Sequence, residues 1–256
     1  IESLQYTTGG SPFIYYYNDG NENIYHQIKN TTNVFGLNDN KELDNKLVGS
    51  GGSRFYLLEH VKHKYDFIIS VDDDIVFDPC WWADIRAGIE ANPSYDLYTC
   101  TVFNTPKKVL LCQGQNIEFL GKNTKRISLK TDKPYLECDT GCGAMKILTG
   151  RLAKQVSFCK DAYTGDDILI DLEIKATGAK GLCITQAKIY HKPDYDMAPP
   201  VPNFRSSEAL LDATLRLYRI HKRYMDYVVA MCFPELKNAS EQVIIETLEQ
   251  LTRQKE

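Results

Sequence analysis

DFIISVDDDIVFDP, residues 66–79, is the stretch that decides the fold, because three consecutive carboxylates directly follow a run of apolar and β-branched residues. The run at 65–70 has the composition of a buried strand. In open α/β sheets, ligands bind at the carboxyl ends of the strands, where Asp72, Asp73 and Asp74 are expected to lie. Carboxylates crowded there repel one another unless a cation neutralises them, and an oxygen-rich cluster suits Mg²⁺ or Mn²⁺. The alternative is a solvated strand end that caps the next helix.

Composition narrows the class of protein. The chain has 256 residues and 43% hydrophobic content, enough for one large domain or two small ones. Thirty basic residues face 34 acidic ones, and no basic stripe marks a nucleic-acid partner. No run of about 18 apolar residues predicts a transmembrane segment, and residues 1–10 lack the features of a signal peptide. We expect a soluble domain, cytoplasmic or Golgi lumenal, that is part of a longer multidomain chain.

The eight cysteines form no C-x-x-C pair, which argues against a thiolate zinc site. The two that lie closest in sequence, Cys138 and Cys142, could form a disulfide in an oxidising compartment. Glycosylation sequons begin at Asn30 and Asn238, but such patterns also arise by chance. The compartment therefore stays open.

Strand and helix patterns alternate along the chain, which predicts an open, largely parallel central sheet flanked by helices. Strands are expected at 12–17, 32–37, 65–70, 96–103 and 181–190, and helices at 20–30, 53–63, 78–91 and 164–178. Between 107 and 129, short apolar runs separated by turn residues indicate a hairpin excursion. Two C-terminal helices are expected, one near 211–232 and one near 240–254.

A second acidic spot, Asp166 and Asp167, lies at the predicted start of a helix. The helix dipole alone favours acidic residues in a first turn. A carboxylate in a pocket can also accept a proton from a hydroxyl nucleophile. Two adjacent carboxylates after Gly165 favour this second interpretation.

Three further features accompany the acidic spots. Gly141 and Gly143 mark a tight loop in which missing side chains would let a substrate approach the backbone. His191 follows the last predicted strand and could complete a metal shell begun by Asp72 and Asp74. Arg205 could hold a phosphate oxygen, although a lone histidine is more often structural and a lone arginine more often a surface residue.

These residues together resemble the metal-dependent glycosyltransferases of the GT-A fold, over roughly residues 12–195. Residues 49–74 (GSGGSRFYLLEHVKHKYDFIISVDDD) are similar to that group's arginine-bearing helix, strand and D-x-D motif. TGCGAM at 140–145 is similar to its glycine-containing acceptor loop, and TGDDILI at 164–170 to its later acidic motif.

The resemblance implies a fold, a set of domain limits and a reaction. The fold is a GT-A, Rossmann-like sheet flanked by helices, in a catalytic domain at 1–203. The nucleotide-sugar half covers about 12–105 and the acceptor half 106–203, with a helical extension at 204–256 packing on the same domain. The reaction is transfer of a sugar from a UDP-sugar, with Mn²⁺ or Mg²⁺ bound, to a hydroxyl of a glycan or other acceptor.

The resemblance also assigns roles to individual residues. Asp72, Asp74 and His191 would bind the metal, and the acceptor would contact Gly141, Cys142 and Gly143. Catalysis would involve Asp166, Asp167 and Arg205. Contacts to the donor nucleotide would come from Tyr16, Tyr17, Asn38, Asp39, Arg54, Asp72 and Asp73.

Within this group, SVDDDIVF (70–77), GDDILIDLEI (165–174) and the segment 203–228 also look like the exostosin-like transferases. Those enzymes retain the anomeric configuration. A family 2-like interpretation, with Asp166 or Asp167 as the base, implies inversion. The sequence leaves this choice open.

Two alternatives belong to other classes. Asp72, Asp74 and Val76 fit the D-x-D-x-T/V motif of haloacid-dehalogenase-like phosphatases, and Gly165, Asp166 and Asp171 resemble their later acidic motif. Against this, two predicted strands precede the motif, whereas the nucleophile of those phosphatases usually lies on the first strand. A non-catalytic nucleotide-sugar-binding domain would require a missing acid or metal ligand, and none is missing from the sequence.

Overall fold

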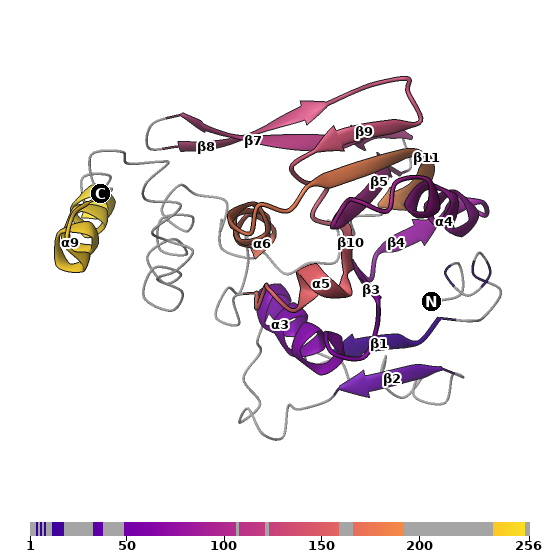
Figure 1. Ribbon diagram of the computed structural model, residues 1–256, viewed down its shortest axis with the longest axis horizontal. Coiled ribbons are helices and arrows are strands. Elements are labelled where there is room, and N and C mark those ends of the chain that lie inside the picture. Colours follow the sequence, from indigo (N-terminus) through magenta and orange to yellow (C-terminus); the bar gives the residue numbers. More distant parts are fainter. Residues whose placement is uncertain are drawn as a thin grey trace.

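The computed structural model describes residues 4, 6, 8, 12–17, 33–37, 49–105, 108–120, 123–158, 166–191 and 238–253 (Figure 1). The strands are β1 (Ile14–Tyr17), β2 (Val34–Leu37), β3 (Phe67–Val71), β4 (Ile75–Phe77), β5 (Leu97–Asn104), β6 (Val109–Cys112), β7 (Gly114–Leu120), β8 (Asn123–Leu129), β9 (Tyr135–Cys138), β10 (Met145–Thr149) and β11 (Gly181–His191). The helices are α3 (Gly49–Val61), α4 (Trp81–Ala91), α5 (Gly150–Ala153), α6 (Asp166–Ala176) and α9 (Glu241–Arg253).

Most predicted elements are present close to their expected limits. The five predicted strands correspond to β1, β2, β3, β5 and β11, and the predicted hairpin excursion corresponds to β6, β7 and β8. Helix α6 ends just before Gly178, whose φ of 76° is the left-handed conformation that glycine adopts most readily. The helices predicted at 20–30 and 211–232 lie outside the described residues. The domain limits proposed from the sequence also stay predictions.

The central sheet has seven strands in the order β3-β10-β5-β11-β4, with β6 paired to β5 and β9 paired to β11. The expectation of a largely parallel sheet needs correction, because only the β5–β11 pairing within this sheet is parallel. Strand β10 follows the hairpin excursion and not a helical crossover, so it runs against both of its neighbours, β3 and β5. Strands β1 and β2 form a separate, parallel pair.

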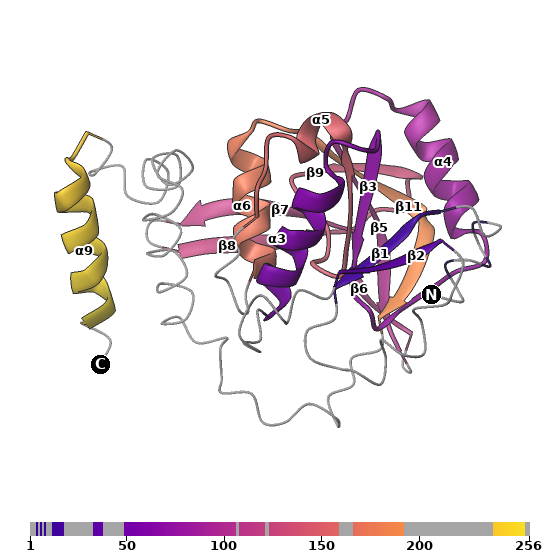
Figure 2. The ribbon, with the colours of Figure 1, turned by 90° about the horizontal axis from the view of Figure 1, so that it is seen from below.

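Helices cover both faces of this sheet, as Figure 2 shows, which confirms the mixed α/β class. The side chains of adjacent β10 residues point to opposite faces of the sheet, because side chains alternate along a strand. Ile147 packs with Trp81 and Ile85 of α4, whereas Leu148 packs with Leu58 of α3 and other residues of α5 and α6. The sheet is therefore the middle of three layers. None of the described helices is long and apolar enough to cross a membrane.

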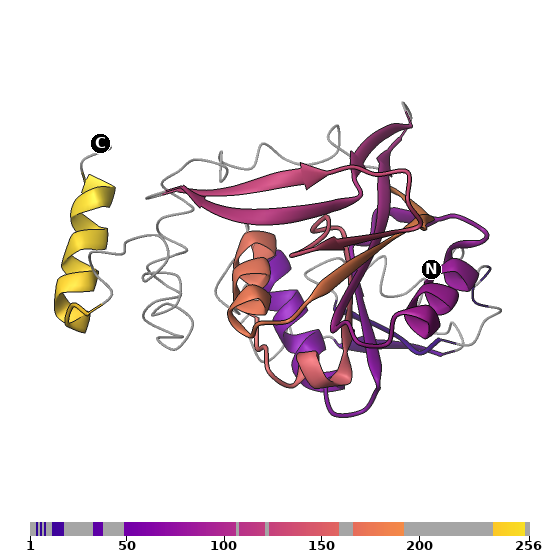
Figure 3. The same ribbon diagram turned by 45° about the horizontal axis from the view of Figure 1, so that its top comes forward.

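The β7–β8 hairpin extends from the sheet and lies over α6 (Figure 3). Polar contacts connect the two elements, because the Lys175 ammonium of α6 donates to the Ile117 carbonyl of β7 at 3.2 Å. The excursion is thus tied to the helix that begins with the second acidic spot.

Helix α4 approaches the sheet closely at Gly88. A Cβ added there would lie 2.5 Å from Cδ1 and 2.6 Å from Cγ1 of Ile184, a fully buried residue of β11. Alanine is favoured over glycine inside a helix by about 1 kcal/mol, but overpacking a core costs about 1–3 kcal/mol. Packing should therefore dominate at this position.

Gly88→Ala is expected to lower the free energy of unfolding by up to about 2 kcal/mol, because the added methyl group would overlap the buried side chain of Ile184 and the gain in helix propensity offsets only part of this cost. Urea unfolding midpoints measure the change. In an Ile184→Ala background, which opens space beside the helix, the same substitution should become neutral or stabilising. Equal effects in both backgrounds would show that Gly88 is not a packing contact.

Candidate active site

The three aspartates form the turn between β3, which ends at Val71, and β4, which begins at Ile75. Strand β4 pairs with β11 so that Ile75 lies opposite His191. This register places Asp74 beside the histidine, with its Oδ2 3.0 Å from Nε2. The short strand β4 was not predicted, yet its pairing brings two of the three predicted metal ligands, Asp74 and His191, together.

Asp72, Asp74 and His191 each present one ligand atom, and these three atoms lie within 4.8 Å of one another. The Oδ1 atom of Asp74 is buried and has no hydrogen-bond partner among the described residues. Burial, together with the carboxylates of Asp72 and Asp73, raises the pKa of Asp74, whereas His191 acts to lower it. A buried oxygen without a donor beside a second carboxylate and an imidazole is an arrangement that fits a divalent cation such as Mn²⁺.

Arg54 of α3 forms an ion pair with the carboxylate of Asp72. Its Nη2 atom also lies 3.5 Å from the carbonyl oxygen of Gly143. The guanidinium is thus placed between residues 72–74, here called the acidic turn, and residues 140–144, here called the glycine loop. The assignment of Arg54 to donor binding stays a prediction.

The glycine loop lies against the end of β3, because the Asp72 backbone N–H donates to the Ala144 carbonyl at 3.0 Å. A Cβ at Gly141 would lie 2.0 Å from Oγ1 of Thr99, and a Cβ at Gly143 would lie 2.8 Å from Cβ of Asp167. In the structure, the space beside these glycines is therefore occupied by the protein's own side chains, Thr99 at Gly141 and Asp167 at Gly143. Acceptor binding by this loop stays a prediction.

Cys138 and Cys142 are free thiols, so the structure does not contain the disulfide considered from the sequence. Burial raises the pKa of Cys138 to about 12 and also raises that of Cys142. Cys138 lies at the end of β9, where it pairs with Gly181, whereas Cys142 lies in the glycine loop. Both side chains remain protonated at neutral pH.

Asp167 lies at the start of α6, where its Oδ2 accepts a hydrogen bond of 2.7 Å from Arg126 of β8. Burial acts to raise the pKa of Asp167, but the charge and hydrogen bond of Arg126, with Lys146 and Arg54, outweigh it and lower the pKa. The carboxylate is ionised, yet its low pKa makes it a weak proton acceptor.

A buried network lies behind Asp167. The carboxylate of Asp171, only 1% exposed, has Lys146 Nζ at 2.8 Å and accepts from Thr140 Oγ1 at 2.5 Å. The Arg126 Nη2 atom lies 2.5 Å from the other Asp171 oxygen. Sequence reasoning missed Arg126 and Lys146. A lysine flanked by Met145 and Ile147 in an apolar strand was the available signal, because a buried charge requires a partner.

Some of the remaining predicted site residues lie in the part of the chain that the structure describes, and the others lie outside it. Tyr17 stacks on Tyr56 of α3 with ring centroids 5.6 Å apart, and the Tyr16 hydroxyl lies over Gly36 of β2. Asp73 is exposed in the acidic turn. Asn38, Asp39, Arg205 and the side chain of Asp166 lie outside the described part of the chain.

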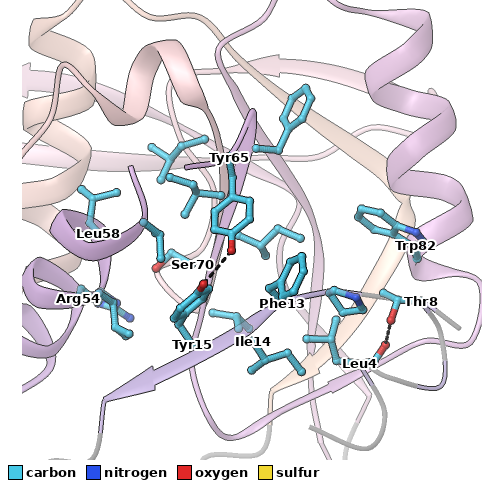
Figure 4. Close-up of a pocket in the computed structure, with 18 of the residues that line it drawn as sticks. Leu4, Thr8, Phe13, Ile14, Tyr15, Arg54, Leu58, Tyr65, Ser70 and Trp82 are labelled. Carbon is cyan, nitrogen blue, oxygen red and sulfur yellow. Dashed lines mark hydrogen bonds between the residues drawn. The ribbon is translucent and has the colours of Figure 1, made fainter. Parts of the chain in front are cut away.

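A cavity of about 390 Å³ lies between β1 and β3 (Figure 4). Its walls are mostly apolar and include residues 12–15 and 67–71. The hydroxyls of Tyr15 and Tyr65 meet at 2.8 Å in the cavity wall. Arg54, which also pairs with Asp72, lines the same space. The cavity therefore adjoins the acidic turn.

Comparison with known proteins shows the fold. Neither protein-family models nor curated proteins match the chain. Among solved structures, it is similar to GalNAc-T7 determined with UDP, GalNAc and Mn²⁺, at 16% identity and a TM-score of 0.57. A second similar structure is S. aureus TarS 1-349, at 14% identity and a TM-score of 0.49, covering 94% of this chain and 70% of that one.

The match to GalNAc-T7 covers 93% of this chain and 48% of that chain. The present sequence thus spans about half the length of that protein. Identity this low supports a statement about architecture alone: the chain has the GT-A fold.

Proposed function

We propose that this chain is a glycosyltransferase that moves a sugar from a nucleoside diphosphate donor, expected to be a UDP-sugar, to a hydroxyl of a glycan or other acceptor. The observation that carries the proposal is the grouping of Asp72, Asp74 and His191 at the strand ends of a GT-A fold. GalNAc-T7, which shares this fold, was determined with UDP and Mn²⁺, and that adds support.

The donor side of the proposed site is built from three elements. Asp72 and Asp74 of the turn and His191 of β11 would hold Mn²⁺ or Mg²⁺. When bound, the cation would neutralise charge on the departing diphosphate. Arg54 forms an ion pair with Asp72, and exposed Asp73 is available to the donor ribose. We assign Tyr16, Tyr17, Asn38 and Asp39 to the nucleoside, and Arg205 to a phosphate oxygen.

The acceptor side is assigned to the start of α6 and to the loop of Gly141, Cys142 and Gly143. Because Arg126 engages Asp167 and lowers its pKa, Asp167 suits acceptance of a hydroxyl hydrogen bond better than removal of a proton. The role of proton acceptor, which an inverting reaction requires, then falls to Asp166. This assignment leaves the stereochemical outcome undecided.

The phosphatase alternative is less well supported by the geometry. In that interpretation, the later acidic motif would join Asp72 and Asp74 in holding Mg²⁺. Instead, Asp171 is buried with Lys146 and Arg126, and His191 completes the group near the acidic turn. Mass spectrometry of enzyme trapped with a phosphomonoester decides the matter: we expect unmodified Asp72, whereas an aspartyl phosphate without sugar transfer would support the phosphatase.

The function is tested first by thermal denaturation with UDP, GDP and CDP, and with their sugar conjugates, in Mn²⁺ or in chelator. We expect UDP compounds to raise the melting temperature when Mn²⁺ is present and not in chelator. A ligand at a hundred times its Kd stabilises the folded protein by about 2.7 kcal/mol. The stabilising UDP-sugar is then assayed for release of UDP with candidate glycan acceptors. Equal stabilisation in chelator would contradict a metal-bound donor.

Asp74→Asn should reduce the affinity for Mn²⁺ by at least about a hundredfold, because the amide keeps the shape of the side chain but removes the anionic ligand. Calorimetric titration measures the change. Asp73→Asn, which alters net charge equally at the adjacent exposed position, is the matched control and should retain Mn²⁺ binding. Equal losses in both variants would mean that general charge at the turn, and not a defined site, attracts the ion.

A further inference from the structure

The carboxylate of Asp72 takes part in two interactions. It forms an ion pair with Arg54, and it also supplies one ligand atom to the group with Asp74 and His191. The Arg54 side chain is only 15% exposed, and Nη2 lies 3.5 Å from the Gly143 carbonyl, so the guanidinium is enclosed between the acidic turn and the glycine loop. A cation in the proposed site would therefore lie next to a fixed positive charge.

Two cations on one carboxylate repel each other. The repulsion between a divalent ion and a guanidinium that contact the same carboxylate is large at the dielectric of a protein surface, and solvent screening reduces it without removing it. A metal ion that enters alone must therefore compete with Arg54 for Asp72. A diphosphate changes this balance, because its oxygens can accept from a guanidinium and bind a metal ion at the same time.

We propose that Arg54 is an exchangeable counter-ion, which neutralises Asp72 while the metal site is vacant and moves to a diphosphate oxygen once the cation and the donor are bound. The inference rests on the proposed function and deepens it. It makes cation and nucleoside diphosphate bind cooperatively, each raising the affinity for the other by the same factor. Arg54 thus opposes the metal ion alone and favours the complete donor complex.

Arg54→Met tests this with two calorimetric titrations, one of Mn²⁺ alone and one of UDP at saturating Mn²⁺. Methionine retains most of the apolar stem that lines the cavity between β1 and β3. We expect Mn²⁺ alone to bind about tenfold more tightly to the variant, because the competing charge is gone. UDP should bind about tenfold more weakly, because a phosphate partner is gone. The two affinities move in opposite directions.

Arg86→Met is the matched control. It removes the same charge from α4, where Arg86 is 62% exposed and pairs with Glu90. Both affinities should stay within about twofold of the wild-type values, since the charge of Arg86 is exposed to solvent and already paired with Glu90. If Arg54→Met fails to fold, Arg54→Lys replaces it: this variant keeps the charge but loses the planar fork. Its Mn²⁺ affinity should stay near wild type while its UDP affinity falls.

Weaker or unchanged Mn²⁺ binding by Arg54→Met would overturn the inference. A loss of affinity would mean that Arg54 preorganises Asp72 for the metal, and the proposed function would be unaffected. If the wild-type protein binds no Mn²⁺ with or without UDP, both the inference and the metal assignment fail. If Asp74→Asn abolishes Mn²⁺ binding while Arg54→Met leaves it unchanged, the inference alone fails.

Discussion

Backbone pairing along β11 is the constraint on which the rest of the structure depends. The first half of this strand pairs with β5 and β9, and after a register shift between Ile184 and Lys188 the second half pairs with β5 and β4. A slip by one residue would turn every side chain to the opposite face, so burial fixes the register. That register places His191 opposite Ile75, and the acidic turn is consequently held beside the histidine.

Charge compensation organises the site around this backbone frame. Three carboxylates are matched by a cationic side chain from a different element: Asp72 by Arg54, Asp167 by Arg126 and Asp171 by Lys146. Asp74 lies beside the imidazole of His191. An unpaired buried charge is costly, so these pairs hold helices and strands at defined positions around the turn. The neighbours explain why the pKa values of Asp74 and Asp167 are shifted in opposite directions. Burial and two further carboxylates raise the pKa of Asp74, whereas Arg126, Lys146 and Arg54 together outweigh burial and lower the pKa of Asp167.

The glycine loop couples the proposed donor side to the proposed acceptor side. The backbone of Asp72 donates to Ala144, Arg54 reaches the carbonyl of Gly143, and Asp167 packs against the same glycine. This coupling exists because β10 is inserted antiparallel between β3 and β5, so the loop before it arrives at the carboxyl end of β3. The acidic turn and the start of α6 are therefore connected through a few direct contacts.

The sequence by itself determined the local elements: the strand before Asp72, the hairpin excursion, the end of α6 at Gly178 and the residue types of a metal site. Periodicity, turn chemistry and composition encode these features within short windows. Only the tertiary structure decided that β10 runs antiparallel, that β4 pairs with β11, and that Arg126 engages Asp167. Such pairings join segments far apart in the chain, and an acidic first turn has the same local pattern whether its carboxylate faces solvent or a distant arginine.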